Sequence, residues 1–328
     1  MKKNYVKAFC AVFGVVSLCV SCQKEVLNEQ LKEDRARIEV SIPTEDTKLI
    51  SDAHDAAVNN YQLFMFKDDG TIEDYVSTTS SNITLDCTRG KKHLFVFVNA
   101  PSLADESNYE TISKKQMLLS DNDENSVVMS SSLTIEVSSS TPETVTMQAV
   151  RKVAKVVLSE LKLEIDIPQY SILPFKVSSV YLINVPADTP YFGMASTSTL
   201  WYNKSGYNPD DDNTLIYDDM GDFQITEQTP YTTKNTFYCC PNKVDNDSFN
   251  SNWSPRHTRL VVEATLGETK YYYPVTLPKM DANKVYSVHL TITRPGLESP
   301  DAEFSKFDAP FQITIKEWVD GGSVSKEY

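Results

Sequence analysis

Hydrophobic and polar positions alternate in short runs along this chain, which is the pattern of half-buried β-strands. In the clearest run, Val288, Leu290 and Ile292 share one side and polar residues occupy the positions between them. Other runs are dense in aliphatic and aromatic residues and end at turn residues. The runs that predict strands are 61–66, 94–98, 153–158, 180–185, 260–266, 270–277 and 285–293. The pattern therefore predicts an all-β protein.

Helix is expected almost nowhere. Only residues 113–119 and 33–38 have a composition that suits a short helix, and neither segment is convincing. The chain has 10 glycines, few for an all-β protein, so asparagine, aspartate, serine and proline are expected to form most of the turns.

Four phenylalanines are the strongest candidates for a core. Phe64 and Phe66 share one face of the run 61–66, and Phe95 and Phe97 share one face of the next run. We expect all four rings to be buried in one N-terminal β-sandwich.

The N-terminus has the pattern of an export signal. Lysines at positions 2, 3 and 7 precede an apolar run, residues 8–20, which is shorter than the roughly 20 residues that span a bilayer as a helix. The run ends in LCVSC, which resembles a bacterial lipobox, with Cys19 at the position where leucine is usual. Residues 1–21 are therefore predicted to be a lipoprotein signal peptide, with Cys22 the lipidated residue. The alternative is an ordinary secretory signal cut near Ser21.

Charge and cysteine content narrow the class of protein. The net charge is −14, and loss of the leader removes three lysines, so the surface would repel nucleic acid. Cys87, Cys239 and Cys240 cannot all pair within one chain, and no zinc-binding spacing accompanies them. We expect them to be small buried hydrophobic residues.

Catalytic motifs are missing from the sequence. The four histidines lie far apart, and there is no nucleophile elbow, HExxH or P-loop, so no enzyme and no cofactor is predicted. Asp210, Asp211 and Asp212 lie in a polar loop and could bind calcium. They lack the spacing and distal glutamate of an EF-hand, so a solvated acidic loop is favoured and no metal site is assigned.

Several segments, taken in order, resemble the fimbrillin-type pilus subunits of the Bacteroides group. The similar segments are 59–70, 91–100, 151–156, 236–242, 270–275, 283–286 and 290–296, with Glu317 and Trp318 near the end. They span nearly the whole chain after the leader. The C-terminal segments are the most similar, and the order and spacing of the set carry the resemblance.

The resemblance implies two tandem transthyretin-like β-sandwich domains after the signal peptide. The expected parts are a lipidated prosegment at 22–48, an N-terminal domain at 49–166 and a C-terminal domain at 167–328 that ends in a donor strand at 311–328. It also implies a lipoprotein precursor on the outer membrane, cut by a trypsin-like protease. The matured subunit would join an extracellular fimbrium that supports adhesion and biofilm formation.

The chain contains the two strands that such assembly by strand exchange requires. Ile38, Val40 and Ile42 alternate on one face of an early strand. An equivalent late strand carries Phe311, Ile313 and Ile315 on one face. Because both strands have the same period and similar apolar volume, one can replace the other in a shared groove. The alternative is that both are ordinary edge strands.

The cleavage site is expected in the polar loop after the early strand. Lys48 is the only basic residue between Ile38 and Lys67, so it is the predicted site, although arginine is commoner at the cut in the family. Arg35 and Arg37 are alternatives, but a cut there would leave the strand attached.

Other roles remain open. The chain could be a shaft subunit, which the C-terminal strand favours, or a tip, accessory or anchor subunit. From a different class, it could be a surface lipoprotein that binds glycans. That function would use rings on loops, namely Trp201, Tyr202, Tyr207 and Trp253.

Overall fold

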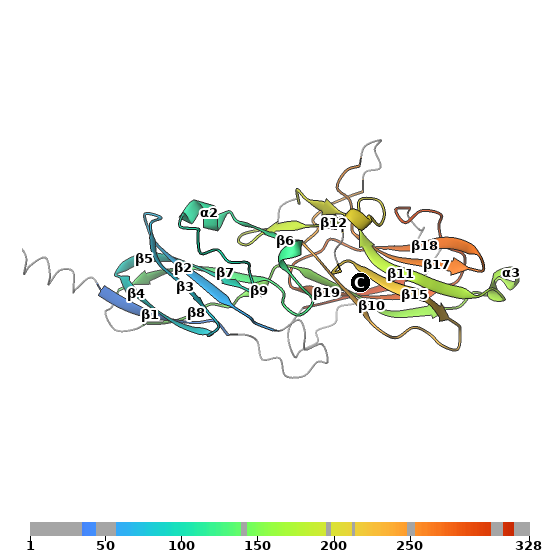
Figure 1. Cartoon of the computed structure of the whole chain (residues 1–328), viewed down its shortest axis with the longest axis horizontal. Coiled ribbons are helices and arrows are strands. Elements are labelled where there is room, and N and C mark those ends of the chain that lie inside the picture. Colours follow the sequence, from blue (N-terminus) through green and yellow to red (C-terminus); the bar gives the residue numbers. More distant parts are fainter. Residues whose placement is uncertain are drawn as a thin grey trace, which may run out of the picture.

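The computed structural model describes residues 35–43, 57–138, 143–194, 198–211, 214–247, 253–302 and 311–317. Nearly all of its regular structure is strand, which confirms the all-β prediction. All seven predicted runs lie on strands, with small shifts at their ends. Two β-sandwiches follow one another along the long axis of the molecule (Figure 1). Within the described residues, no helix has the length and apolar character needed to cross a membrane.

The first sandwich has a three-stranded and a five-stranded sheet. The three-stranded sheet has the order β4 (Asn82–Thr88), β1 (Arg35–Ser41) and β8 (Glu143–Thr146). The five-stranded sheet has the order β3 (Ile72–Thr78), β2 (Tyr61–Lys67), β5 (Gly90–Val98), β7 (Met129–Val137) and β9 (Val150–Arg151). Apolar residues from both sheets form one buried cluster between them.

The second sandwich has two four-stranded sheets. One has the order β16 (Asn235–Cys239), β10 (Ala154–Leu163), β19 (Lys284–Ile292) and β20 (Phe311–Glu317). The other has the order β15 (Tyr217–Ile225), β11 (Phe175–Ile183), β17 (Arg259–Leu266) and β18 (Thr269–Thr276). Both sheets contribute to one large apolar cluster.

Short elements join and cover the sandwiches. Two small ribbons pair β12 (Val185–Pro186) with β14 (Trp201–Tyr202) and β13 (Asp188–Pro190) with β6 (Gln116–Leu118). The described helices are α2 (Tyr109–Ser113), α3 (Pro168–Ser171) and the 3-10 turns η1 (Leu119–Asp121) and η2 (Pro209–Asp211). Of the two segments weighed as helix, 113–119 holds the end of α2 and β6, and 33–38 contributes to β1.

The expected domain boundary at residue 166 is wrong. Strand β10 lies between β16 and β19 in a sheet of the second sandwich, antiparallel to the first and parallel to the second. The change of sandwich therefore falls in the connection between β9 and β10. The hydrophobic run alone could not assign β10 to a sheet, because the partner strands lie about 80 and 130 residues further along the chain.

The four phenylalanines are buried as predicted, but not in the interior of the first sandwich. That interior holds the alternate residues of the same strands, such as Leu63 and Met65. The rings lie on the opposite face of the five-stranded sheet and belong to the large cluster of the second sandwich. Tyr109 of α2 covers Phe66 at a centroid distance of 5.6 Å, and Tyr191 covers Phe97 at 4.8 Å. Strands β2 and β5 are thus buried on both faces, which explains their unbroken hydrophobicity.

Asparagines close several turns, in line with the low glycine content. Asn99, Asn184 and Asn283 adopt φ values of 57°, 54° and 57°, the left-handed region that asparagine tolerates better than most residues. The amide of Asn99 also donates to the carbonyl oxygens of Ala57 at 2.8 Å and Val127 at 3.1 Å. These side chains therefore fix the loops that follow the strands.

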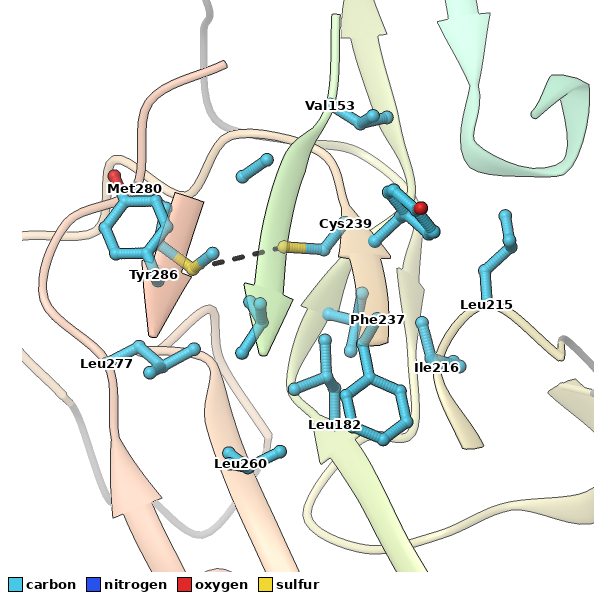
Figure 2. Close-up of a cluster of buried hydrophobic side chains, with 14 of the residues drawn as sticks. Val153, Leu182, Leu215, Ile216, Phe237, Cys239, Leu260, Leu277, Met280 and Tyr286 are labelled. Atoms are coloured by element: carbon cyan, nitrogen blue, oxygen red, sulfur yellow. Dashed lines mark hydrogen bonds between the residues drawn. The ribbon is translucent and has the colours of Figure 1, made fainter. Parts of the chain in front are cut away.

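Cys87, Cys239 and Cys240 are free and buried, which confirms their expected role as small hydrophobic residues. Figure 2 shows Cys239 in the core of the second sandwich, with its sulfur 4.0 Å from the Sδ of Met280. Phe237 and Leu182 lie in the same cluster.

Candidate functional site: the β1 slot and strand β20

Strand β1 is the middle strand of its sheet and pairs along both edges. It runs antiparallel to β4, from Arg35 opposite Thr88 to Ser41 opposite Asn82. Residues 38–41 also pair in parallel with β8. Loss of β1 would separate β4 from β8 and leave two edges of unpaired backbone groups. Such edges readily pair with another chain.

The inward side chains of β1 are sealed from solvent. Ile38, Val40 and Ile42 are at most 1% exposed, and Ala36 is 7% exposed. We refer to the space that these four side chains fill as the β1 slot. Burial of each large aliphatic side chain contributes roughly 1.5–3 kcal/mol. The remaining walls of the cluster include Leu63, Met65, Ile83, Leu85, Cys87, Leu94 and Val96. An uncut β1 is therefore firmly held.

The outward face of β1 is polar and exposed. Arg37 Nε donates to Asp86 Oδ1 at 2.8 Å, and both side chains are more than half exposed. Exposed ion pairs contribute little to stability. The binding energy of β1 therefore comes from its inward face and its backbone hydrogen bonds.

A buried ion pair borders one end of the β1 slot. Lys92 Nζ lies 2.6 Å from Glu73 Oε2, with side-chain exposures of 2% and 8%. Thr88 donates to the same carboxylate through its backbone N–H at 2.8 Å and its hydroxyl at 2.6 Å. Burial alone would raise the pKa of Glu73, but the hydrogen bonds from Lys92 and Thr88 outweigh it and lower the pKa. The carboxylate is thus charged, with Thr88 bonded to Oε1 and Lys92 ion-paired with Oε2.

Ala36 lies close to this charged end. Its backbone pairs with Cys87, and both residues line an open hollow together with Glu73. Burial raises the pKa of the Cys87 thiol to about 11, so it is a neutral thiol at physiological pH. This end of the slot takes a small, uncharged side chain.

Strand β20 has a different environment. Among the described residues it pairs only with β19, from Phe311 opposite Leu290 to Glu317 opposite Lys284, and forms the edge of its sheet. Ile313 and Ile315 are only partly buried against the large cluster.

A charged network fixes the chain shortly before β20. The carboxylate of Asp301 accepts from Arg256 and Arg259, each at 2.5 Å, and from the Asn184 amide at 3.0 Å. Arg259 also pairs with Asp247 at 2.6 Å, and its side chain is 0% exposed. We refer to these five residues as the Asp301 network. It ties the segment that follows β19 to the body of the second sandwich.

The structure accounts for some of the predicted site residues and leaves others outside its description. Cys22 and Lys48 lie outside the described residues. Arg35 and Arg37 lie on β1 itself and are exposed. The two strand-exchange sets lie on different sandwiches, so the fold does not bring them together within one molecule. The inward set on β1 is Ile38, Val40 and Ile42, and the set on β20 is Phe311, Ile313 and Ile315.

Sequence reasoning missed three features of the site. Ala36 extends the inward alternation by one position, and the period of two could have revealed it. The parallel pairing with β8 and the ion pair of Glu73 with Lys92 depend on contacts between distant segments. A local sequence pattern could not predict them.

The rings considered for glycan binding do not form an exposed platform. Trp201 is 6% exposed and packs edge-on against Trp253, with ring centroids 5.4 Å apart. Trp253 Nε1 donates to Asn184 Oδ1 at 3.1 Å. Tyr207 is 41% exposed and stacks on Tyr217. Trp201 and Trp253 therefore hold loops together, which argues against this alternative.

The acidic loop has a structural contact of its own. Asp211 accepts from the backbone N–H of Asn203 at 2.6 Å. Among the residues that the structure describes, no group of three or more metal-ligating side chains gathers.

Comparison with solved structures identifies the class of fold. A candidate cell adhesion protein of Bacteroides eggerthii superposes with a TM-score of 0.67 at 16% identity, over 87% of this chain and 96% of that one. A fimbrilin (FimA) of Porphyromonas gingivalis W83 gives 0.61 at 14% identity, over 88% and 98%. The tip fimbrial protein Mfa3 of Porphyromonas gingivalis, truncated at its C-terminus, gives 0.54 at 13% identity, over 87% and 100%. The fold is that of fimbrial β-sandwich proteins.

A sequence match to a protein family covers the first sandwich and the following strand β10. Residues 36–163 match the family model of the major fimbrial subunit protein (FimA). This part of the chain, 36–163, is thus similar in sequence to the major fimbrial subunit protein. No curated protein matches significantly.

Proposed function

We propose that the chain is a shaft subunit that polymerises by exchange of strand β1. It is exported as an outer-membrane lipoprotein through Cys22, and a trypsin-like protease then cuts after Lys48. The released β1 is replaced by strand β20 of another subunit. The completed polymer is an extracellular fimbrium that supports adhesion.

The central position of β1 carries this proposal. It supplies an apolar face buried to 1% exposure or less at three residues, and it has a paired backbone along both edges. A donor strand must restore both the buried apolar face and the paired backbone. Exchange would therefore yield an interface between subunits that is packed like a protein core. Strand β20 has the required alternation and, in the part of the chain that the structure describes, would have to separate only from β19.

The pairing of β1 favours Lys48 over the two arginines as the cleavage site. Arg35 and Arg37 lie within the ladder between β1 and β4, where a protease would first have to separate the strands. Lys48 lies in the connection from β1 to β2. A cut there separates β1 from the rest of the fold.

Substitution of Lys48 tests the maturation step. Cells expressing Lys48→Ala are expected to carry folded, uncut, monomeric lipoprotein, whereas Lys48→Arg is expected to be cut and to polymerise. Lys176→Ala, an exposed lysine on β11, is the matched control. The N-terminal residue of purified subunits and their ladder on non-boiled gels give the readout. Wild-type pili whose subunits retain residues 38–42 would contradict the proposal.

Deletion of residues 311–328 tests the donor. The shortened subunit should be cut and should accept a strand but not donate one, so it should shorten pili when mixed with wild type. Long detergent-resistant homopolymers of the deletion variant would show that β20 is not the donor. The shaft assignment would fail with it, leaving the tip, accessory and anchor roles.

A further inference from the structure

We propose that the donated strand enters the β1 slot in the same direction as β1 and in one register. In this register Phe311, Ile313 and Ile315 take the positions of Ile38, Val40 and Ile42. The inference rests on the proposed function and specifies which residues of two copies of this chain meet.

The outward positions agree with this register. Gln312 takes the position of Glu39, an isosteric replacement, and Thr314 takes the position of Ser41, with the hydroxyl retained. The outward face of β1 is exposed and polar, and both replacements keep it polar. The donor thus reproduces the alternation of the native strand on both of its faces.

The charged end of the β1 slot determines the direction in which the donated strand runs. A donor running the other way, with Ile313 still in the central Val40 position, would bring Glu317 to the position of Ala36. Ala36 is 7% exposed and lines the same hollow as Glu73. A second carboxylate there would be buried beside the first, where like charges repel and desolvation is costly. In the forward register, the residue that falls in line with Ala36 is number 309, which is also alanine.

The size of the slot excludes shifted registers. A shift by one residue would turn Gln312 and Thr314 into the apolar core. A forward shift by two would put Phe311 in the position of Ala36, whose backbone partner Cys87 is itself buried. Overpacking of this kind is destabilising, because the larger side chain forces its neighbours out of their places. The Ala36 position therefore selects both direction and register.

Four double-cysteine variants of the full precursor test the register. Each combines Thr84→Cys or Asn82→Cys in the acceptor strand β4 with Gln312→Cys or Thr314→Cys in the donor. In the present pairing Thr84 lies opposite Glu39, and Asn82 lies opposite Ser41. Directly opposed residues of antiparallel strands have Cα atoms about 4.5–5.5 Å apart, within the range of a disulfide. Thr84 and Asn82 are exposed, so neither change enters the core.

Polymers from each variant are oxidised mildly and separated on denaturing gels with and without reductant. We expect reducible ladders for the pairs 84 with 312 and 82 with 314, and none for the swapped pairs 84 with 314 and 82 with 312. Ladders from the swapped pairs, or polymers that cross-link in no pair, would overturn the register while strand exchange stands. If the polymers do not depend on residues 311–328, the proposed function itself fails.

Discussion

Strands β1 and β20 have similar alternating sequences but very different surroundings. Strand β1 lies between two neighbours, and its isoleucines are at most 1% exposed. Strand β20 has one neighbour, and Ile313 and Ile315 remain partly exposed. A central strand gains two backbone ladders and full burial, whereas an edge strand gains one ladder and partial burial. The neighbours of a strand, rather than its own sequence, therefore decide how firmly it is held.

This difference fits opposite roles in exchange. In the proposed exchange, the better-held strand would need a covalent cut before it could leave, whereas the weakly held one would need only to separate from β19. The Asp301 network would then keep the segment before β20 attached to the second sandwich. The four predictions below probe this contrast, from the largest expected effect to the smallest.

Asp301→Asn should produce the largest loss, because it leaves the buried Arg259 without one of its two carboxylate partners. Breaking a buried ion pair costs about 3–5 kcal/mol. The free energy of unfolding, measured with denaturant on the monomeric precursor, should fall by that order. Asp245→Asn is the matched control, because its pair with Lys279 is exposed, and it should cause no measurable change. An equally stable Asp301→Asn variant would show that the network does not fix this segment.

Ile38→Ala and Ile313→Ala compare the two strands directly. Truncation of a fully buried isoleucine costs about 2–5 kcal/mol, so Ile38→Ala should strongly destabilise the monomer. Ile313→Ala should cost markedly less, because that side chain is only partly buried. Denaturant unfolding of both precursors gives the comparison. Equal losses would mean that β20 is held as firmly as β1.

Glu73→Gln tests the charged end of the slot. A carboxyl group whose pKa is lower in the folded state stabilises the fold above its ordinary pKa of 4.5, and this contribution disappears as the pH falls through the folded value. The variant should be less stable by about 1–3 kcal/mol at neutral pH, since Lys92 loses its buried partner. The gap to wild type should narrow below about pH 4.5. If the difference in stability between the variant and wild type stayed constant from neutral pH to below about pH 4.5, the lowered pKa of Glu73 would be contradicted.

Arg37→Ala should have the smallest effect, because its pair with Asp86 is exposed. We expect unchanged unfolding and unchanged pili. Loss of pili in this variant would show that the outward face of β1, and not only its inward face, takes part in assembly or maturation.

The sequence allowed most strands to be predicted, since the alternation that predicts them is local. It also placed Ile38, Val40 and Ile42 on one face, which the structure shows to be buried. It misplaced strand β10, and it assigned the phenylalanines of β2 and β5 to the wrong side of their sheet. Both errors concern what packs on a strand, which depends on segments far away in the chain.

The sequence by itself determined the all-β character, the inward and outward faces of β1 and β20, and the candidate residues for lipidation and cleavage. Only the tertiary structure decided that β1 is central and β20 peripheral, and that Ala36 lies at a charged end of the slot. A period of two fixes which side chains share a face, because successive residues of a strand point to opposite sides. It carries no information about how many neighbours pair with that strand. Burial and hydrogen bonding across the whole fold determine those neighbours. The sequence pattern alone therefore could not predict the arrangement of the site.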